Sequence, residues 1–276
     1  MIKAITCALA FLIPSLSAAV TQGFMKVTIP SFFGDETLRL EYYEHLPQKW
    51  NGHVILMSHG STGGNRSEST LKTSIKFLNI GKLATSHGFI FVVLNRKGRG
   101  QSEGTFTEES RRCDTRSLTN ELDEAEIQLN QFAKHIREKH NVKKLILMGH
   151  SRGGLLSAHY AGKNPSEVSA VVNLAGGWST MCEQRNGGFG KYHLENSAKI
   201  FKNQYWIYFE NDSYFKENKF GDPEYHWLRT ISQQYGIEFH QFSDSGRPDG
   251  HQTPTWTPKE WASIVLPRLR KSLENQ

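Results

Sequence analysis

Residues 145–163 read LILMGHSRGGLLSAHYAGK, and this segment carries the clearest indication of the fold. Its four leading apolar residues are typical of a short strand that is buried on both faces. The sequence GHSRG, residues 149–153, follows at once and opens a segment of helical period. A strand that turns directly into a helix crowds the positions two before and two after Ser151, so both must be glycine. The stretch therefore predicts a sharp turn that holds a strained backbone at Ser151 and raises its hydroxyl above a sheet edge, beside the N–H donors of a helix.

The same unit of a short apolar run, a polar loop and a helical segment recurs along the chain. This alternation predicts a doubly wound, mostly parallel α/β sheet with right-handed crossovers, whose ligand site lies at the carboxyl ends of the strands. Thr37–His45 alternates apolar and polar residues, which predicts an antiparallel strand at the N-terminal edge. The expected core strands are 54–57, 89–94, 145–148, 170–174, 205–209 and 237–242, and the expected helices are 71–87, 118–140, 152–163, 223–235 and 258–273.

The composition is that of a soluble globular protein, with 37% hydrophobic and 22% charged residues among 276. The chain has neither an internal repeat nor a long linker, so a single catalytic domain over residues 20–276 is expected, as a monomer or weak homodimer. The formal net charge of +6 comes from dispersed basic residues, and we therefore expect no nucleic-acid partner.

Residues 1–19 have the pattern of a secretory signal peptide. A lysine at position 3 precedes the apolar run Ala4–Leu16, and Ser17–Ala19 offers small residues for cleavage. The run is too short to span a bilayer, so we expect a secreted or periplasmic protein without stable membrane insertion. Cleavage would remove Cys7 and leave two cysteines, Cys113 and Cys182.

A serine nucleophile needs a histidine base, and the base needs an acid to orient it. In this kind of sheet the acid precedes the histidine, each on a loop after a later strand. Asp212 follows the strand 205–209 and is assigned as the acid; His251 follows the last strand and is assigned as the base. Glu210 competes for the acid role but lies nearest the strand, while Asp244 and Asp249 are interpreted as turn residues.

The oxyanion formed by acyl transfer requires two N–H donors. Arg152 supplies the first, directly after the nucleophile. The glycine-rich loop SHGSTGG, residues 58–64, supplies the second; Ser61 is assigned, with Gly60 and Thr62 as alternatives. Gly60 is also assigned to substrate binding, because glycine lets the backbone approach a ligand closely. The loop lacks the signature of a phosphate site, and the chain has no H-E-x-x-H, so neither a cofactor nor a metal is expected.

Two short lid loops, residues 100–117 and 176–196, can overhang such a site. Trp178 in the second loop is assigned to a substrate pocket, with packing of the loop against the domain as the alternative. Cys113 and Cys182 lie one in each loop, and we expect a disulfide between them; the alternative is two unpaired buried cysteines.

His59 and His150 are expected to hydrogen-bond to backbone. Two roles are considered for the Arg152 side chain: contact with a substrate carboxylate, or an ion pair with another residue. Tyr214 is expected in the core or at a rim.

Together these motifs resemble the α/β-hydrolase superfamily over about residues 38–269. The resemblance is closest to the secreted, dienelactone-hydrolase-like esterase branch, whose acid loop is similar to residues 207–215. Residues 96–104 are similar to a turn shared with X-prolyl peptidases and bacterial esterases. The motifs that carry the resemblance are residues 149–153, His59-Gly60, Asp212 and 249–251.

The resemblance implies serine hydrolase activity without a cofactor and a triad of Ser151, Asp212 and His251. Dienelactone hydrolases use a cysteine nucleophile, so their substrate is not carried over. The expected reaction is hydrolysis of a small-molecule carboxylic ester or lactone through an acyl-enzyme. A peptidase or amidase is the alternative, although such peptidases usually add a gating domain, for which this chain has no room. A binding protein that keeps the fold without turnover is a third reading.

Overall fold

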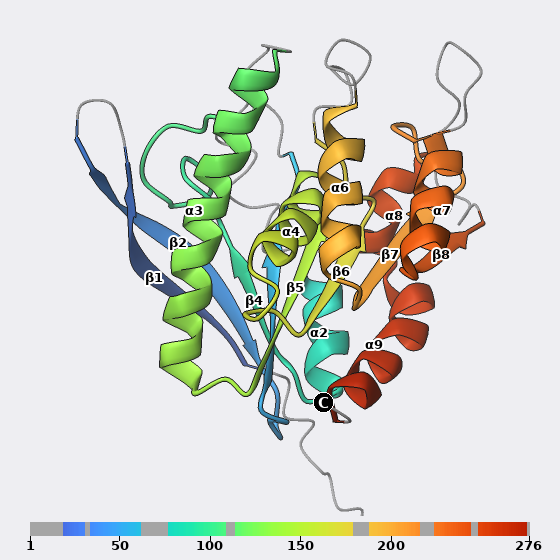
Figure 1. Ribbon diagram of the computed structural model, residues 1–276. Coiled ribbons are helices and arrows are strands. Elements are labelled where there is room, and N and C mark those ends of the chain that lie inside the picture. Colours follow the sequence, from blue (N-terminus) through green and yellow to red (C-terminus); the bar gives the residue numbers. More distant parts are fainter. Residues whose placement is uncertain are drawn as a thin grey trace, which may run out of the picture.

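The computed structural model describes residues 19–30, 34–61, 77–108, 114–178, 188–215, 224–243 and 248–274. Eight strands of this described part form one sheet in the order β1-β2-β4-β3-β5-β6-β7-β8 (Figure 1). Strands β3 to β8 are parallel, whereas β2 pairs antiparallel with both β1 and β4. The predicted mostly parallel sheet with an antiparallel N-terminal edge is confirmed. The strands are β1 Ala19–Ile29, β2 Glu36–Leu46, β3 His53–Ser58, β4 Ile90–Leu94, β5 Lys144–His150, β6 Ala170–Leu174, β7 Gln204–Phe209 and β8 Glu238–Phe242.

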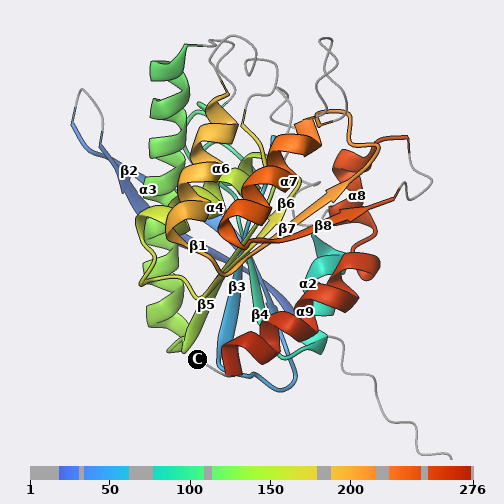
Figure 2. The same ribbon diagram turned by 45° about the vertical axis from the view of Figure 1, so that its right-hand side comes forward.

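Helices cover both faces of the sheet (Figures 1 and 2). Helices α3, α4, α6 and α7 contribute to the apolar cluster on one face, and α2 and α9 to the cluster on the other. Because both faces are covered, the central strands are buried along their whole length, as their apolar runs predicted. The helices are α2 Leu78–Ser86, α3 Thr115–His140, α4 Arg152–Lys163, α6 Phe189–Ile200, α7 Glu224–Tyr235, the 3-10 turn η1 Gly250–Gln252, α8 Thr253–Trp256 and α9 Lys259–Glu274.

Strand β1, helix α6 and the two short elements η1 and α8 were not expected from the sequence. Strand β1 buries Met25, Val27 and Ile29, an alternation that a period-two search of this segment would have detected. Helix α6 lies in the second predicted lid loop and buries Phe189 and Leu194. Its apolar stripe is sparse, because polar residues take half of its positions and one of them, Ser197, lies on the buried face; such a pattern favours a loop.

A buried carboxylate anchors the turn over residues 96–104 to strand β2. Glu41 accepts hydrogen bonds from the Asn95 amide at 2.7 Å and from the Gln101 backbone at 2.8 Å. Burial alone would raise the pKa of Glu41, but its hydrogen-bond donors hold that pKa below the usual value. The buried Arg96, at the start of this turn, forms an ion pair with Glu108, which follows the turn. These contacts fix the carboxyl end of β4.

The leader assigned to residues 1–19 falls almost wholly outside the described part, which begins at Ala19. Residues 71–76 of the first predicted helix also lie outside it. Among the residues that are described, no helix has the length and apolar character needed to cross a membrane.

Candidate active site

The turn between β5 and α4 holds Ser151 in a backbone conformation that side chains rarely adopt, with φ at 55° and ψ at −123°. A Cβ on Gly149 would overlap the backbone of Gly153, and a Cβ on Gly153 would overlap the backbone of Ser58. The two glycines are therefore required for the steric reason that the sequence suggested. The Ser151 N–H donates to the Leu174 carbonyl at 2.9 Å, which ties the turn to β6.

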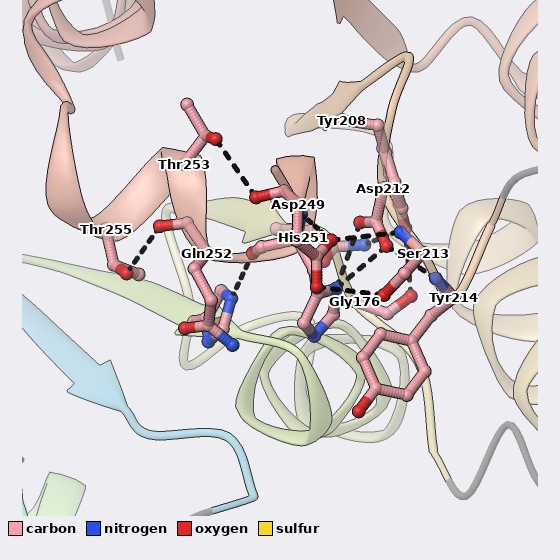
Figure 3. A network of polar contacts seen from close by, with 12 residues as sticks. Gly176, Tyr208, Asp212, Ser213, Tyr214, Asp249, His251, Gln252, Thr253 and Thr255 are labelled. Carbon is pink, nitrogen blue, oxygen red and sulfur yellow. Dashed lines mark hydrogen bonds and ion pairs between the residues drawn. The ribbon is translucent and has the colours of Figure 1, made fainter. Parts of the chain in front are cut away.

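Asp212 and His251 form a buried pair at the carboxyl end of the sheet (Figure 3). The Nδ1 atom of His251 lies 2.9 and 3.1 Å from the two carboxylate oxygens of Asp212. An Nδ1–H that donates to this carboxylate leaves the lone pair on Nε2, which is the tautomer that a general base needs. Glu210, the competing acid, is exposed. The structure thus pairs His251 with the aspartate that the chain order indicated.

Asp249 links the acid loop to the histidine loop. Its carboxylate accepts from the backbone N–H of His251 at 2.9 Å and from both the N–H and the hydroxyl of Ser213, at 3.0 and 2.9 Å. Burial alone would raise the pKa of Asp249, but these donors hold that pKa below the usual 3.8. Asp249 is therefore a turn residue, as predicted, that also joins the two loops. Asp244 lies outside the described residues.

The two histidines of the motifs contact backbone, as expected. His150 is buried, and its Nε2 lies 2.7 Å from the main-chain oxygen of His251, so Nε2 must carry the proton. This bond joins the turn at Ser151 to the loop that carries His251, a long-range link without a signal in the sequence. His59 donates from Nδ1 to the Gly60 carbonyl at 2.8 Å and accepts at Nε2 from the Arg96 N–H at 3.2 Å. His59 is therefore neutral and holds the loop after β3.

The loop after β3 passes directly against the turn at Ser151. A Cβ built on Gly60 would lie 2.7 Å from Cβ of Ser151, so this position also has to be glycine. Ser61 follows and is exposed. Arg152 is the first residue of α4, where the N–H groups of a helix lack intrahelical acceptors. Both assigned oxyanion donors therefore belong to backbone that flanks Ser151. Thr62, an alternative donor, lies outside the described residues.

Trp178 is fully buried and belongs to the core. Its indole Nε1 donates to Glu121 at 3.4 Å, and the guanidinium carbon of Arg152 lies 5.5 Å from the ring centroid. The assigned substrate-binding role therefore needs revision, because the ring presents its surface to protein groups rather than to solvent. These contacts favour the alternative in which Trp178 packs the loop against the domain. The Arg152 side chain packs against this ring as a cation on an aromatic face.

One group of described residues has the donor types of a metal site. Ligand atoms of Asp123, Glu126 and His159 lie within 4.8 Å of one another on α3 and α4. The Glu126 carboxylate is already 2.6 Å from the ammonium of Lys163 and 3.3 Å from Nε2 of His159. Because these side chains can balance one another's charge, we assign no metal to the group. Ser151 and the Asp212–His251 pair lie instead on the loops after the strands.

A family model described as alpha/beta hydrolase fold matches residues 53–214. The match spans more than half of the sequence, and the chain belongs to the α/β hydrolase fold family. No curated protein matches it.

Solved structures with this fold include several described as esterases. An esterase from Pyrococcus furiosus is 12% identical, covers 92% of this chain and 90% of its own, and gives a TM-score of 0.56. Est1E from Butyrivibrio proteoclasticus with ferulic acid bound is 13% identical, with coverage of 87% and 96% and a TM-score of 0.57. A carboxylesterase structure from Nitrososphaera gargenis is 14% identical, with coverage of 91% and 100% and a TM-score of 0.57. At these identities the likeness shows the shared fold.

Replacing Asp249 tests the link between the two loops. Asp249→Ala removes three accepted hydrogen bonds, one of them a cap of η1, and we expect it to lower the free energy of unfolding by about 1 kcal/mol at pH 7. The lowered pKa of Asp249 implies a contribution that is present above its unfolded-state pKa of 3.8 and is lost as the pH falls through the lower folded-state pKa.

Urea unfolding of the wild type, Asp249→Ala and Asp249→Asn at several pH values between 7 and 3 measures this contribution. The charge-dependent part, seen as the difference between the wild type and Asp249→Asn, should shrink below about pH 4. A difference that stays constant down to pH 3 would contradict the assigned role of the carboxylate charge.

Proposed function

We propose that the chain is a serine hydrolase that cleaves a small-molecule carboxylic ester or lactone through an acyl-enzyme on Ser151. The observation that carries the proposal is the buried Asp212–His251 pair, which lies on loops at the same sheet edge as the strained turn at Ser151. A pair of this kind prepares a histidine to accept a proton from a serine hydroxyl.

In the proposed reaction the Ser151 hydroxyl oxygen attacks the ester carbonyl carbon while Nε2 of His251 takes the hydroxyl proton. The resulting oxyanion is stabilised by the N–H groups of Arg152 and Ser61. Collapse of the tetrahedral intermediate breaks the bond to the alcohol oxygen, which receives the proton from His251. A water molecule then attacks the acyl-enzyme with the same proton transfers in sequence, and the acid is released. Asp212 holds the His251 ring and stabilises its protonated form.

Esters are favoured over amides as the substrate class. Several solved structures of similar fold are described as esterases or carboxylesterases, which supports an ester substrate without identifying it. The proposed serine nucleophile sets this chain apart from true dienelactone hydrolases, and kinship with their branch is proposed only on the similarity of residues 207–215 to its acid loop. Cleavage of amides by the same residues is the alternative, and turnover of matched esters and amides distinguishes the two.

We further propose that the protein is exported after cleavage near Ala19, and that Cys113 and Cys182 form a disulfide. Both cysteines lie outside the described residues, in the stretches 109–113 and 179–187. The described strand β1 begins at Ala19, so cleavage beside Ala19 would leave the strand nearly complete. An oxidising compartment would favour pairing of the two remaining cysteines.

Labelling with a fluorophosphonate probe tests the nucleophile. The wild type should be labelled and should hydrolyse 4-nitrophenyl acetate faster than 4-nitroacetanilide. Ser151→Ala should abolish labelling and lower kcat by about 10⁴-fold or more, because the remaining residues cannot supply a nucleophile. Ser263→Ala, which removes an exposed hydroxyl on α9, is the matched control and should behave as wild type.

A wild-type protein that neither takes up the probe nor hydrolyses any ester would contradict the enzyme assignment. Faster turnover of the anilide than of the ester would support the amidase alternative.

Peptide mapping of the exported protein tests the processing and the disulfide together. Without reducing agent, the map should contain a peptide that joins Cys113 to Cys182, and the mature N-terminus should fall near Ala19. Two free thiols would contradict the proposed disulfide, and an N-terminus that retains Met1 would contradict the proposed signal peptide.

A further inference from the structure

Tyr214 places an exposed aromatic ring against the imidazole of the buried histidine. The two ring centroids are 4.4 Å apart, and the rings are tilted by 55°. The Tyr214 residue is 46% exposed, whereas His251 is 4% exposed. Solvent and substrate can therefore reach the tyrosine ring, which borders a histidine that is otherwise enclosed.

The carboxylate of Asp212 itself holds the backbone that carries the Tyr214 ring. The Tyr214 backbone N–H donates to Oδ1 of Asp212 at 2.9 Å, and the next residue, Phe215, is buried in the core. In Figure 3 the phenol ring lies alongside the imidazole and extends to the side away from Asp212, with its hydroxyl directed away from the carboxylate. The ring thus lies toward the part of His251 that carries Nε2, the atom that would exchange protons with a substrate.

The chemistry of acyl transfer determines which half of a substrate meets this ring. During acylation Nε2 gives its proton to the alcohol oxygen, which must then lie within about 2.6–3.2 Å of Nε2. The alcohol portion of the ester is therefore held beside His251 and next to Tyr214. During deacylation the alcohol has departed and water occupies its place. Contact with Tyr214 consequently acts on the alcohol portion and on the acylation step.

We propose that Tyr214 determines specificity by selecting esters whose alcohol portion carries an aromatic ring. The inference rests on the proposed function and names the substrate class for that same site. A face or edge of an exposed phenol ring can pack against an aromatic group, and such contacts in proteins correspond to a preference of about three- to tenfold. A short alkyl alcohol is too small to cover the ring.

The experiment compares kcat/KM for three esters. Benzyl acetate carries a ring on the alcohol side, ethyl phenylacetate carries one on the acyl side, and ethyl acetate carries neither. For Tyr214→Ala we expect the ratio of benzyl acetate to ethyl acetate to fall by about three- to tenfold, while the ratio of ethyl phenylacetate to ethyl acetate stays at the wild-type value. Tyr214→Phe keeps the ring and should keep the wild-type ratios.

Two further variants exclude structural explanations. Tyr214→Leu keeps an apolar side chain without a ring; it should also lower the benzyl ratio, and it gives the test a second variant if Tyr214→Ala does not fold. Trp50→Ala removes an aromatic side chain of similar exposure, 39%, before β3 at the opposite end of the sheet, and should leave both ratios unchanged. A disturbed Asp212 would lower turnover of all three esters alike and would cancel in the ratios.

The outcomes separate this inference from the function on which it rests. A benzyl ratio that is unchanged in Tyr214→Ala and Tyr214→Leu, or an equal fall in the acyl-side ratio, would overturn the role of Tyr214 while leaving ester hydrolysis intact. A wild type that hydrolyses none of the three esters and takes up no fluorophosphonate would overturn both.

Discussion

The site depends on the strained, positive-φ backbone of Ser151. A serine at a φ of 55° is disfavoured by roughly 1–3 kcal/mol, so the surrounding structure has to hold it there. Hydrogen bonding to β6 restrains it on one side, and the first turn of α4 restrains it on the other. The turn is possible only because Gly149 and Gly153 lack side chains where β5, α4 and the end of β3 meet. A buried parallel sheet that sets these elements at fixed spacing is therefore what keeps the serine in position.

The other groups of the site are joined to this turn by hydrogen bonds rather than by contacts along the chain. His150 connects the turn to the main chain of His251, Asp249 connects the histidine loop to the acid loop, and Asp212 completes the link to the His251 ring. On the other side, His59 holds the glycine-containing loop after β3 to the turn that follows β4. Loops that follow five strands, β3, β4, β5, β7 and β8, are thus held by a few polar contacts. Burying these polar groups costs desolvation energy, which their hydrogen-bond partners offset.

The features that could be predicted from the sequence are those with a local cause. Apolar runs marked the central strands because strands buried on both faces are apolar throughout. The glycines around Ser151 indicated a steric requirement of the turn. Asp212 was preferred to Glu210 because Glu210 lies nearest the end of the strand. Strand β1 lacked a clear signal because only its last five residues alternate in burial, and α6 because its apolar stripe is sparse. The burial of Trp178 and the contact of Tyr214 with His251 depend on how loops fold back, and composition does not record this.

The central claim is that Ser151 and His251 act as one catalytic unit, and a double-mutant cycle tests it most directly. The measurement is kcat for 4-nitrophenyl acetate in the wild type, Ser151→Ala, His251→Ala and the double variant. If the histidine acts only by moving protons to and from the serine, the double variant should lose no more activity than the more damaging single variant. Losses that multiply in the double variant would show that the two residues act independently and would contradict the account.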